Sequence, residues 1–421
     1  MRTAIICTIL VFITSGALRA ETLTLSAALS KSSAANRTLK LAFHDKKIAE
    51  EAIILNRSGF LPRMDIQGGY TAQHKPQSVN TPFATFATQD QDFFFASLGI
   101  TQTICDFGRT YARYERAKAV SDATRLAYKG QEQDVFLRTV VSYFQILQTQ
   151  KLLQATDEEV AQMTDHLRVA KNLFEQGVVT RNDLLQAEVR LSSSRQRRLE
   201  TANRLENAWL VLNDLMGEAP EHRSTLSEES RYEETSLDIP VKDAVENRPE
   251  LQAQRRLLDA SGLEVKESRT GYYPEIFTKL GLDYVENSRV REQVILAATV
   301  GLKVNLFDGL ATTARYRQAV ENRSRSEERL RQLNDDLALE YRTAVNDARV
   351  AKERIAATET SIKSGEENLR INKDRYQEQV GTATDVIDAQ TLLTQIKAEN
   401  YQAIFDYEVA LARVKRARGE L

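Results

Sequence analysis

The feature that most constrains the fold is an internal duplication. Residues of the first half recur 202 positions later without a gap from Gly99 to Glu218, and the matching pairs include Ala112-Arg113-Tyr114 with Ala314-Arg315-Tyr316, Gly99 with Gly301, and Asp183 with Asp385. Each copy carries the same ordered pattern of helix, strand, loop, strand, very long helix, turn and returning helix. We therefore predict one structure with a two-fold internal repeat, made of residues 21–218 and 247–421 and joined by a linker or equatorial segment at 219–246.

Composition narrows the fold class. The 421 residues include only 17 Gly and 7 Pro, while 28% are charged and 7% are aromatic. Few turn formers and many charges favour long helices over a sandwich or an α/β enzyme. The formal net charge of −2 gives no electrostatic reason to expect a nucleic-acid partner.

The N-terminus has the pattern of a secretory signal peptide over residues 1–20. Arg2 supplies a positive charge, Ile5–Ile13 is apolar, and small residues follow, with cleavage after Ala17 or Ala20 as the two options. An uncleaved membrane anchor is the alternative, but the apolar run is too short to span a bilayer comfortably. We therefore predict export from the cytoplasm.

Four segments alternate apolar residues with polar or small ones, and they lie at about 63–73, 92–105, 274–286 and 293–306. Period-two alternation predicts strands with one apolar face, and these strands are long enough to cross a bilayer at a tilt. Four strands are too few to close a barrel, and an open sheet edge cannot lie in lipid. A membrane location therefore requires several chains, whereas a half-buried sheet in a soluble domain is the alternative.

The two hairpin loops differ in length. The offset between copies is 212 residues at Gly59–Pro62 and Gly271–Pro274, but 202 residues at Gly99 and Gly301. The first hairpin is thus ten residues longer, and its extra length lies around His74–Pro82. This polar, proline-containing stretch is typical of an external loop.

Very long helices follow the strands, at about 109–216 and 311–418. No proline interrupts Arg109–Gln176 or Ala311–Gln379, and apolar residues recur at heptad-like steps. A cytosolic coiled coil would explain these helices but would leave the amphipathic strands unexplained.

Each long helix ends at a turn and returns, at Phe174–Asp183 and at Tyr376–Asp385. Glycine followed by Thr or Asn and then Asp indicates a helix stop and a new N-cap. Capping is therefore the simplest role for Asp183 and Asp385. Asp388 adds a second carboxylate one turn further on the same helix face, so a closed ring of such helices would concentrate carboxylates at its mouth.

In this order, and duplicated, these features resemble the TolC family of outer-membrane efflux proteins. The matching motifs are Asn36-Arg37, Asn247–Leu251, the Gly-x-x-Pro strand entries, Leu306–Gly309, Val380–Thr382 and Asp385–Ala389. The resemblance implies a mixed α/β membrane protein of Gram-negative bacteria. It implies a trimer whose 12-stranded β-barrel, with four strands per chain, continues into a long periplasmic α-helical barrel.

The resemblance also implies a function and its partners. The protein would be a channel-tunnel in the outer membrane, an exit duct for drug efflux or for type I secretion of a polypeptide. A periplasmic adaptor (membrane fusion protein) and an inner-membrane transporter would open it at its periplasmic tip. The alternative is a periplasmic coiled-coil adaptor or scaffold without a channel, which predicts a soluble chain.

Site residues follow from the resemblance in the same way. Asp385 and Asp388 match a cation-binding ring at the tunnel mouth, and Asp183 and Tyr376 match a hydrogen-bonded gate. The family's tip arginine is missing, because Ala383 or Gly381 occupies its position, and Arg181 or Arg375 would compensate. The tips that would meet the adaptor are Gly177, Val178, Val179, Val380, Gly381 and Thr382.

No residue pattern indicates catalysis. The four histidines are scattered without metal-ligand spacing, and the sequence has neither a phosphate-binding glycine-rich loop nor a nucleophile elbow. The Asp385–Asp388 pair lies on adjacent turns of one helix and does not form a general acid and base flanking a substrate. We expect neither an enzyme nor a cofactor.

Overall fold

A computed structural model describes residues 22–228, 237, 239–378 and 380–421. The predicted signal peptide, part of the predicted linker and Gln379 of the second predicted long helix lie outside the described residues. The chain divides into two compact units. Unit 1 comprises residues up to Arg37, Val135–Leu237 and Ala344–Val414, and unit 2 comprises Thr38–Asp134, Asp238–Thr343 and Lys415–Leu421. Each unit contains parts of both sequence copies, so the compact units cut across the repeats.

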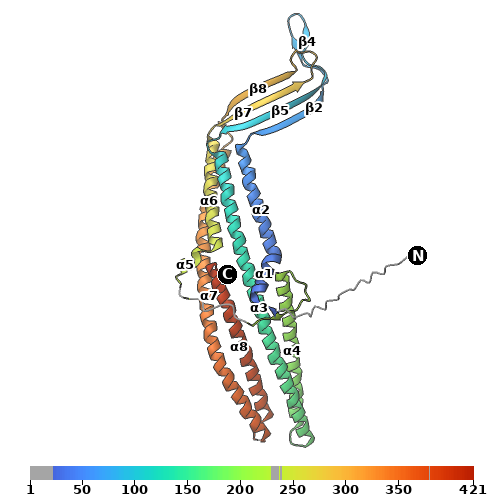
Figure 1. Cartoon of the computed structure of the whole chain (residues 1–421), viewed down its shortest axis with the longest axis vertical. Helices are drawn as coiled ribbons and strands as arrows, with labels where there is room; N and C mark the ends of the chain where they lie inside the picture. The colour runs from blue at the N-terminus through green and yellow to red at the C-terminus, as the bar shows by residue number, and fades with distance from the viewer. Residues whose placement is uncertain (1–21, 229–236, 238, 379) are drawn as a thin grey trace, which may run out of the picture. The chain divides into compact units, whose positions relative to one another are not determined.

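Unit 2 contains a four-stranded antiparallel sheet in the order β2-β5-β7-β8. Its strands are β2 (Arg63–Ala72), β5 (Asp92–Cys105), β7 (Glu275–Val285) and β8 (Val294–Lys303) (Figure 1). Each copy supplies one hairpin, and β5 pairs with β7 between the copies. β8 ends at Lys303, so the prediction of a strand to residue 306 was wrong, and Val304 and Leu306 lie in the connection to the next helix.

The sheet has one apolar and one polar face. Leu98 lies opposite Leu282, and Leu282 lies opposite Leu296, whose side chain is 78% exposed. On the other face Thr101 lies opposite Lys279, which lies opposite Thr299. The apolar face is therefore uncovered in the single chain. Among the described strands, the two edge strands, β2 and β8, each have a neighbour in this sheet on one side only.

The first hairpin loop contains more structure than the sequence predicts. Strands β3 (Ser78–Asn80) and β4 (Thr85–Ala87) form a small antiparallel pair within it. The loop is joined to the second hairpin loop by Asn287, which donates to the Thr88 carbonyl at 2.9 Å, and by Ser288, which donates to Asp90 at 2.8 Å.

The helices of unit 2 repeat between the copies. α2 (Arg37–Arg57) and α6 (Pro249–Arg269) both have 21 residues, and each leads through a short 3₁₀ helix, η1 (Ser58–Phe60) or η2 (Thr270–Tyr272), into a strand. α5 (Val241–Glu246) precedes α6.

Four further helices form the long hairpins. α3 (Arg109–Glu175) and α7 (Ala311–Gln377) have 67 residues each, and both belong partly to each unit. The returning helices, α4 (Arg181–Met216) and α8 (Ala383–Arg418), have 36 residues each. None of the described helices has the length and apolar content that a membrane crossing requires.

In unit 1, α1 (Leu25–Ala35) lies next to a parallel bridge between β1 (Thr22–Leu23) and β6 (Thr225–Leu226). Tyr143 of α3 is 1% exposed, and its hydroxyl contacts the carbonyls of Leu23 at 2.9 Å and Ser227 at 2.7 Å. Val140 and Leu147, which share its heptad-like stripe, are also buried. This stripe forms part of the core of unit 1.

Candidate functional site at the helix turns and strand–helix junctions

The turn between α3 and α4 is closed by a glycine in the left-handed region. Gly177 has φ +75°, and its N–H donates to the Phe174 carbonyl at 3.0 Å. The N–H of Val178 donates to the Leu173 carbonyl at 2.9 Å. These bonds satisfy carbonyls at the end of α3, and only glycine adopts this conformation without strain.

Asp183 caps the start of α4. Its Oδ2 accepts from the N–H of Thr180 at 2.9 Å and from the Thr180 hydroxyl at 2.8 Å, and Thr180 Oγ1 accepts from the N–H of Asp183 at 3.3 Å. These bonds with Thr180 lower the pKa of Asp183. The capping role that the sequence favoured is therefore present in the structure.

The turn between α7 and α8 uses a different closure and the same cap. The N–H groups of Val380 and Gly381 donate to the Arg375 carbonyl at 2.9 and 3.0 Å. A Cβ on Gly381 would lie 3.1 Å from the Cβ of Arg375, so glycine is needed here for close packing. Thr382 and Asp385 exchange hydrogen bonds of 2.9 and 3.2 Å, and these bonds, with the charge of Arg375, lower the pKa of Asp385.

Most of the predicted docking and cation-binding residues are accessible. Val178 is 54% exposed and Val380 is 68% exposed, while Val179 and Gly381 are half-buried. On α8, Asp385 and Asp388 are exposed, and the two residues between them are buried. The two carboxylates therefore lie on the outer surface of α8 in the single chain.

The predicted gate residues are only partly brought together. The Tyr376 ring packs against a cluster of Leu369, Val386, Ala389 and Leu393. Its hydroxyl is buried and has no hydrogen-bond partner among the described residues. Burial, and then the negative charge of Asp183, raises the pKa of Tyr376.

The hydrogen bond expected between Asp183 and Tyr376 is thus absent from the described chain, because Asp183 is engaged by Thr180. Arg181 is exposed at the first residue of α4, and within the described part of the chain it bonds to neither gate residue.

A cavity that the sequence did not predict lies beside Tyr376. Its volume is about 460 Å³, and its lining includes Gln162, His166 and Gln390. The rings of His166 and Tyr376 are 6.0 Å apart between centroids. The Oε1 atoms of Gln162 and Gln390 are buried without a hydrogen-bond partner in the described chain, as is the Tyr376 hydroxyl. In the sequence Gln162 and His166 of α3 are far from Tyr376 and Gln390, which belong to the second copy, and His166 was simply one of four scattered histidines.

His166 is expected to make the packing of the hairpins sensitive to acid. Burial lowers the pKa of His166 below its ordinary 6.5, and the charge of Asp165 partly opposes this shift. Lys373 and Tyr376 of α7 also line the cavity. Because the neutral ring is favoured in the folded state, stability is full above about pH 6.5 and falls as the pH drops below it. Thermal melts at about pH 7.5 and about pH 5.5 should differ less in His166→Gln than in the wild type. An equal difference in both proteins would contradict this role, and exposed His44→Gln is the control.

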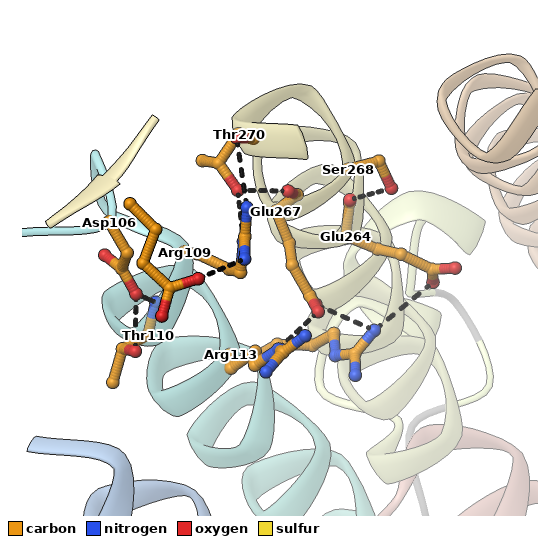
Figure 2. A network of polar contacts seen from close by, with 10 residues as sticks. Asp106, Arg109, Thr110, Arg113, Glu264, Glu267, Ser268 and Thr270 are labelled. Atoms are coloured by element: carbon orange, nitrogen blue, oxygen red, sulfur yellow. Dashed lines mark hydrogen bonds and ion pairs between the residues drawn. The ribbon is translucent and has the colours of Figure 1, made fainter. Parts of the chain in front are cut away.

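In unit 2, an aspartate caps each long helix where it leaves the sheet, and Figure 2 shows the first of these caps, Asp106 with Thr110. Asp106 Oδ2 accepts from the N–H and the hydroxyl of Thr110 at 2.7 and 2.6 Å. Asp308 repeats this cap with Thr312 at 3.0 and 2.7 Å. The aspartate that recurs at this shift therefore marks the start of each long helix, and in the second copy it belongs to the Phe307-Asp308-Gly309 motif.

The first of these junctions also carries a cluster of ion pairs that joins α3 to α6 and β7 (Figure 2). Arg109 contacts Glu275 at 3.4 Å and the Thr270 hydroxyl at 3.2 Å. Arg113 contacts Glu267 at 2.6 Å. Arg116 adds contacts to Glu267 at 3.3 Å and Glu264 at 3.9 Å, so three cations meet three carboxylates and the cluster is neutral.

A second charged cluster in unit 2 is more deeply buried. Arg416, near the end of α8, is 4% exposed and contacts Asp134 at 2.7 Å and also Glu250. Arg248 is 2% exposed and contacts Glu250 at 3.1 Å and Glu340 at 3.0 Å. The sequence identified Arg248 and Glu250 only as part of a family motif and gave no sign that Arg416 joins them.

Comparison with known proteins assigns the chain to a family. The model of the family described as outer membrane efflux protein matches residues 28–218 and 241–420. The chain belongs to the outer membrane efflux protein family. The predicted resemblance is thereby confirmed, and this family consists of channels.

Relatives of this efflux protein include secretion and efflux components. It is 25% identical over 362 residues to the proteases secretion protein PrtF of Dickeya chrysanthemi, covering 80% of this chain and 77% of that protein. It is 24% identical over 391 residues to the outer membrane protein TolC of Vibrio cholerae, covering 89% and 85%. The protein is accordingly an outer-membrane channel of a Gram-negative bacterium, serving efflux or type I secretion.

Solved structures agree on the fold. The outer-membrane channel OprN superimposes with a TM-score of 0.82 at 18% identity, covering 94% of this chain and 90% of that chain. The CmeC outer membrane channel of Campylobacter jejuni gives 0.84 at 17% identity, covering 94% and 85%. The strands and long helices of this efflux protein therefore follow the architecture of such channels.

Proposed function

We propose that three copies of this efflux protein close their sheets into one 12-stranded barrel and form a continuous exit duct. Two observations support closure by several copies. The four-stranded sheet has two open edges, and its apolar face is exposed, with Ile66 at 82% and Val300 at 79%. Open edges are too costly in lipid, so β8 of one copy must pair with β2 of the next.

The internal repeat supplies the register of that pairing. β5 and β7 pair between the two copies of the repeat, with Ser97 opposite Asp283. The offsets of 202 and 212 residues map these two residues to Thr299 of β8 and Thr71 of β2. The proposed barrel therefore places Thr299 opposite Thr71 of the partner subunit.

Cysteine crosslinking tests this register. In a Cys105→Ser background, the pair Thr71→Cys with Thr299→Cys should oxidise into a covalent trimer, because directly opposed residues of paired strands lie within disulfide reach. The pair Tyr70→Cys with Thr299→Cys is the control, since Tyr70 points to the other face. A soluble monomer without crosslinks would contradict the duct and would favour a periplasmic scaffold.

We propose that the turns of the helix hairpins form the periplasmic end of the duct. Exposed Val178 and Val380, with Gly177, Val179, Gly381 and Thr382, would meet a periplasmic adaptor, which couples the duct to an inner-membrane transporter. Asp385 and Asp388 would form a cation-binding ring at the mouth. Because PrtF is a proteases secretion protein, a polypeptide is a candidate cargo beside drugs.

The gate would lie at Asp183, Tyr376 and Arg181. The buried Tyr376 hydroxyl, which has no hydrogen-bond partner among the residues that the structure describes, is the group available to Asp183 when the hairpins tighten.

Tyr376→Phe tests this gate. Because the hydroxyl makes no hydrogen bond within the described chain, its removal should change the free energy of unfolding by less than about 0.5 kcal/mol. Resting conductance in planar bilayers should nevertheless rise, because the closed state loses a bond. Wild-type conductance in this variant would show that the tyrosine only packs against its apolar cluster.

A further inference from the structure

The two strand–helix junctions of the repeat carry different charges. In the first junction, three arginines of α3 are balanced by three carboxylates of α6 and β7. The second junction is formed by α7 and, in the proposed trimer, by α2 and β2 of the partner subunit. Its charges can be deduced by applying the repeat offsets to each residue of the first.

Contacts within each copy show which residues of the two copies correspond. A Cβ on Gly59 would lie 3.0 Å from Thr110 Cγ2, and a Cβ on Gly271 would lie 3.0 Å from Thr312 Cγ2. α2 and α6 have the same length and lead into equivalent 3₁₀ turns. The offsets of 202 residues for α3 and α7, and 212 for α2 and α6, therefore identify true counterparts.

Of the six charged residues, only one arginine recurs. Arg113 corresponds to Arg315, but Glu267 corresponds to Leu55 and Glu275 corresponds to Arg63. The remaining counterparts are uncharged, namely Ala311 for Arg109, Gln318 for Arg116 and Ala52 for Glu264. The second junction therefore has no carboxylate at the positions equivalent to those that balance the arginines of the first junction.

Two cations of the second junction already face a pocket in the single chain. Lys303 and Arg315 line a hollow of about 500 Å³ at the end of the sheet, and Arg109, Arg113, Glu267 and Glu275 of the first junction also line it. Neither forms an ion pair with any residue that the structure describes. Lys303 lies opposite Glu275 in the register and on the polar face of the sheet, which would line the channel interior.

We infer that Lys303 and Arg315 form an oxyanion-binding site at each subunit junction, flanked by Arg63 of the partner subunit, which lies four residues along β2 from the position opposite Lys303. The inference rests on the proposed trimer, because Arg63 comes from a second copy. Arg63 is balanced by Asp65 at 3.0 Å, and in the hollow Glu275 and Glu267 are balanced by Arg109 and Arg113, so Lys303 and Arg315 leave a net charge of about +2. Guanidinium and ammonium groups without a carboxylate bind phosphate or carboxylate oxygens through charge-assisted hydrogen bonds.

Inorganic phosphate is the first probe, applied to the full channel in planar bilayers at constant ionic strength. Phosphate should reduce single-channel current in the wild type, and Lys303→Gln with Arg315→Gln should weaken this effect by about tenfold. Arg317→Gln, an exposed neighbour on another face of α7, should behave like the wild type. A hexaglutamate peptide is the second probe, and it distinguishes a carboxylate-bearing chain from a free anion as the ligand. Block by the peptide at a lower concentration than phosphate identifies the carboxylate-bearing chain. Equal or weaker block by the peptide identifies the free anion.

A gain of charge provides a second, independent test. Leu55→Glu restores the carboxylate that the first junction has at Glu267, so it should pair with Arg315 of the neighbouring copy and reduce phosphate block without removing any cation. Unchanged block in both this variant and the double variant, measured on trimers verified by native mass spectrometry, would overturn the site while leaving the duct intact. Failure to form trimers in the wild type would overturn the duct and the site together.

Discussion

Replacing Asp385 and Asp388 with asparagine is expected to release the channel from block by divalent cations. In the proposed trimer these positions would supply six carboxylates to one mouth. A carboxylate a few ångströms from a divalent cation contributes on the order of 1–2 kcal/mol even with water-like screening. Losing several such terms should raise the half-blocking cation concentration by at least about a hundredfold, since about 1.4 kcal/mol corresponds to a factor of ten.

Asparagine is the informative replacement because Asp385 has a second role. Its Oδ2 accepts from the N–H of Thr382, and the side-chain oxygen of asparagine can keep this bond, whereas alanine would lose it at a cost of about 1 kcal/mol. Single-channel recordings with increasing Mg²⁺ provide the measurement. Unchanged block with intact thermal stability would show that the cation site lies elsewhere.

The pKa of Asp385 adds a pH dependence to this expectation. Hydrogen bonds from Thr382 hold the pKa below its ordinary value of 3.8. The carboxylate therefore stays charged as the pH falls, and block should persist to a lower pH than an uncapped aspartate would allow.

Arg416→Met is expected to cause the largest loss of stability, about 3 kcal/mol. The substitution leaves Glu250 without one of its two guanidinium partners in a buried setting and removes the contact to Asp134. Removing one partner of a fully buried ion pair usually lowers the free energy of unfolding by somewhat more than this. Here the side chains of Glu250 and Asp134 are still 26% and 45% exposed, so water replaces part of the lost interaction. Thermal or denaturant unfolding of the detergent-solubilised protein measures the difference.

Arg413→Met is the matched control on the same helix. Arg413 is half-exposed and contacts Asp347 only at 3.9 Å, so its loss should cost less than about 1 kcal/mol. Equal losses of stability in the two variants would mean that the buried cluster stabilises the fold no more than an exposed ion pair does.

Acid titration examines the same cluster. Burial alone would raise the pKa of Glu250, but Arg248 and Arg416 outweigh it, and the pKa lies below 4.5. The contribution of this carboxylate is thus complete above about pH 4.5 and is lost as the pH falls through its lower folded value.

Much of the local structure could be predicted from the sequence because it depends on near neighbours. The Thr180–Asp183 and Thr382–Asp385 caps join residues that are three positions apart. Gly177 could be predicted to end α3 because the left-handed conformation at a helix end favours glycine. Strand alternation is equally local. Only the end of β8 was misplaced, because the apolar alternation continues through Val304 and Leu306 after strand pairing has stopped at Lys303.

Contacts between distant segments could not be predicted in this way. His166 and Tyr376 are separated by most of the second copy, and Arg416 reaches Asp134 across 282 positions. No sequence periodicity or motif predicts either contact, because each depends on how two long helices align. The gate residues were predicted from the family resemblance. The structure adds that Asp183 caps the start of α4.

The equal lengths of the paired helices restrict how this gene can change. α3 and α7 have 67 residues each, and α4 and α8 have 36 each, while the first hairpin loop is ten residues longer than the second. One residue inserted into a helix would shift its turn by about 1.5 Å and rotate it by about 100° relative to the other hairpin. Viable insertions and deletions should therefore accumulate in the loops between strands, where epitope tags would also be tolerated best.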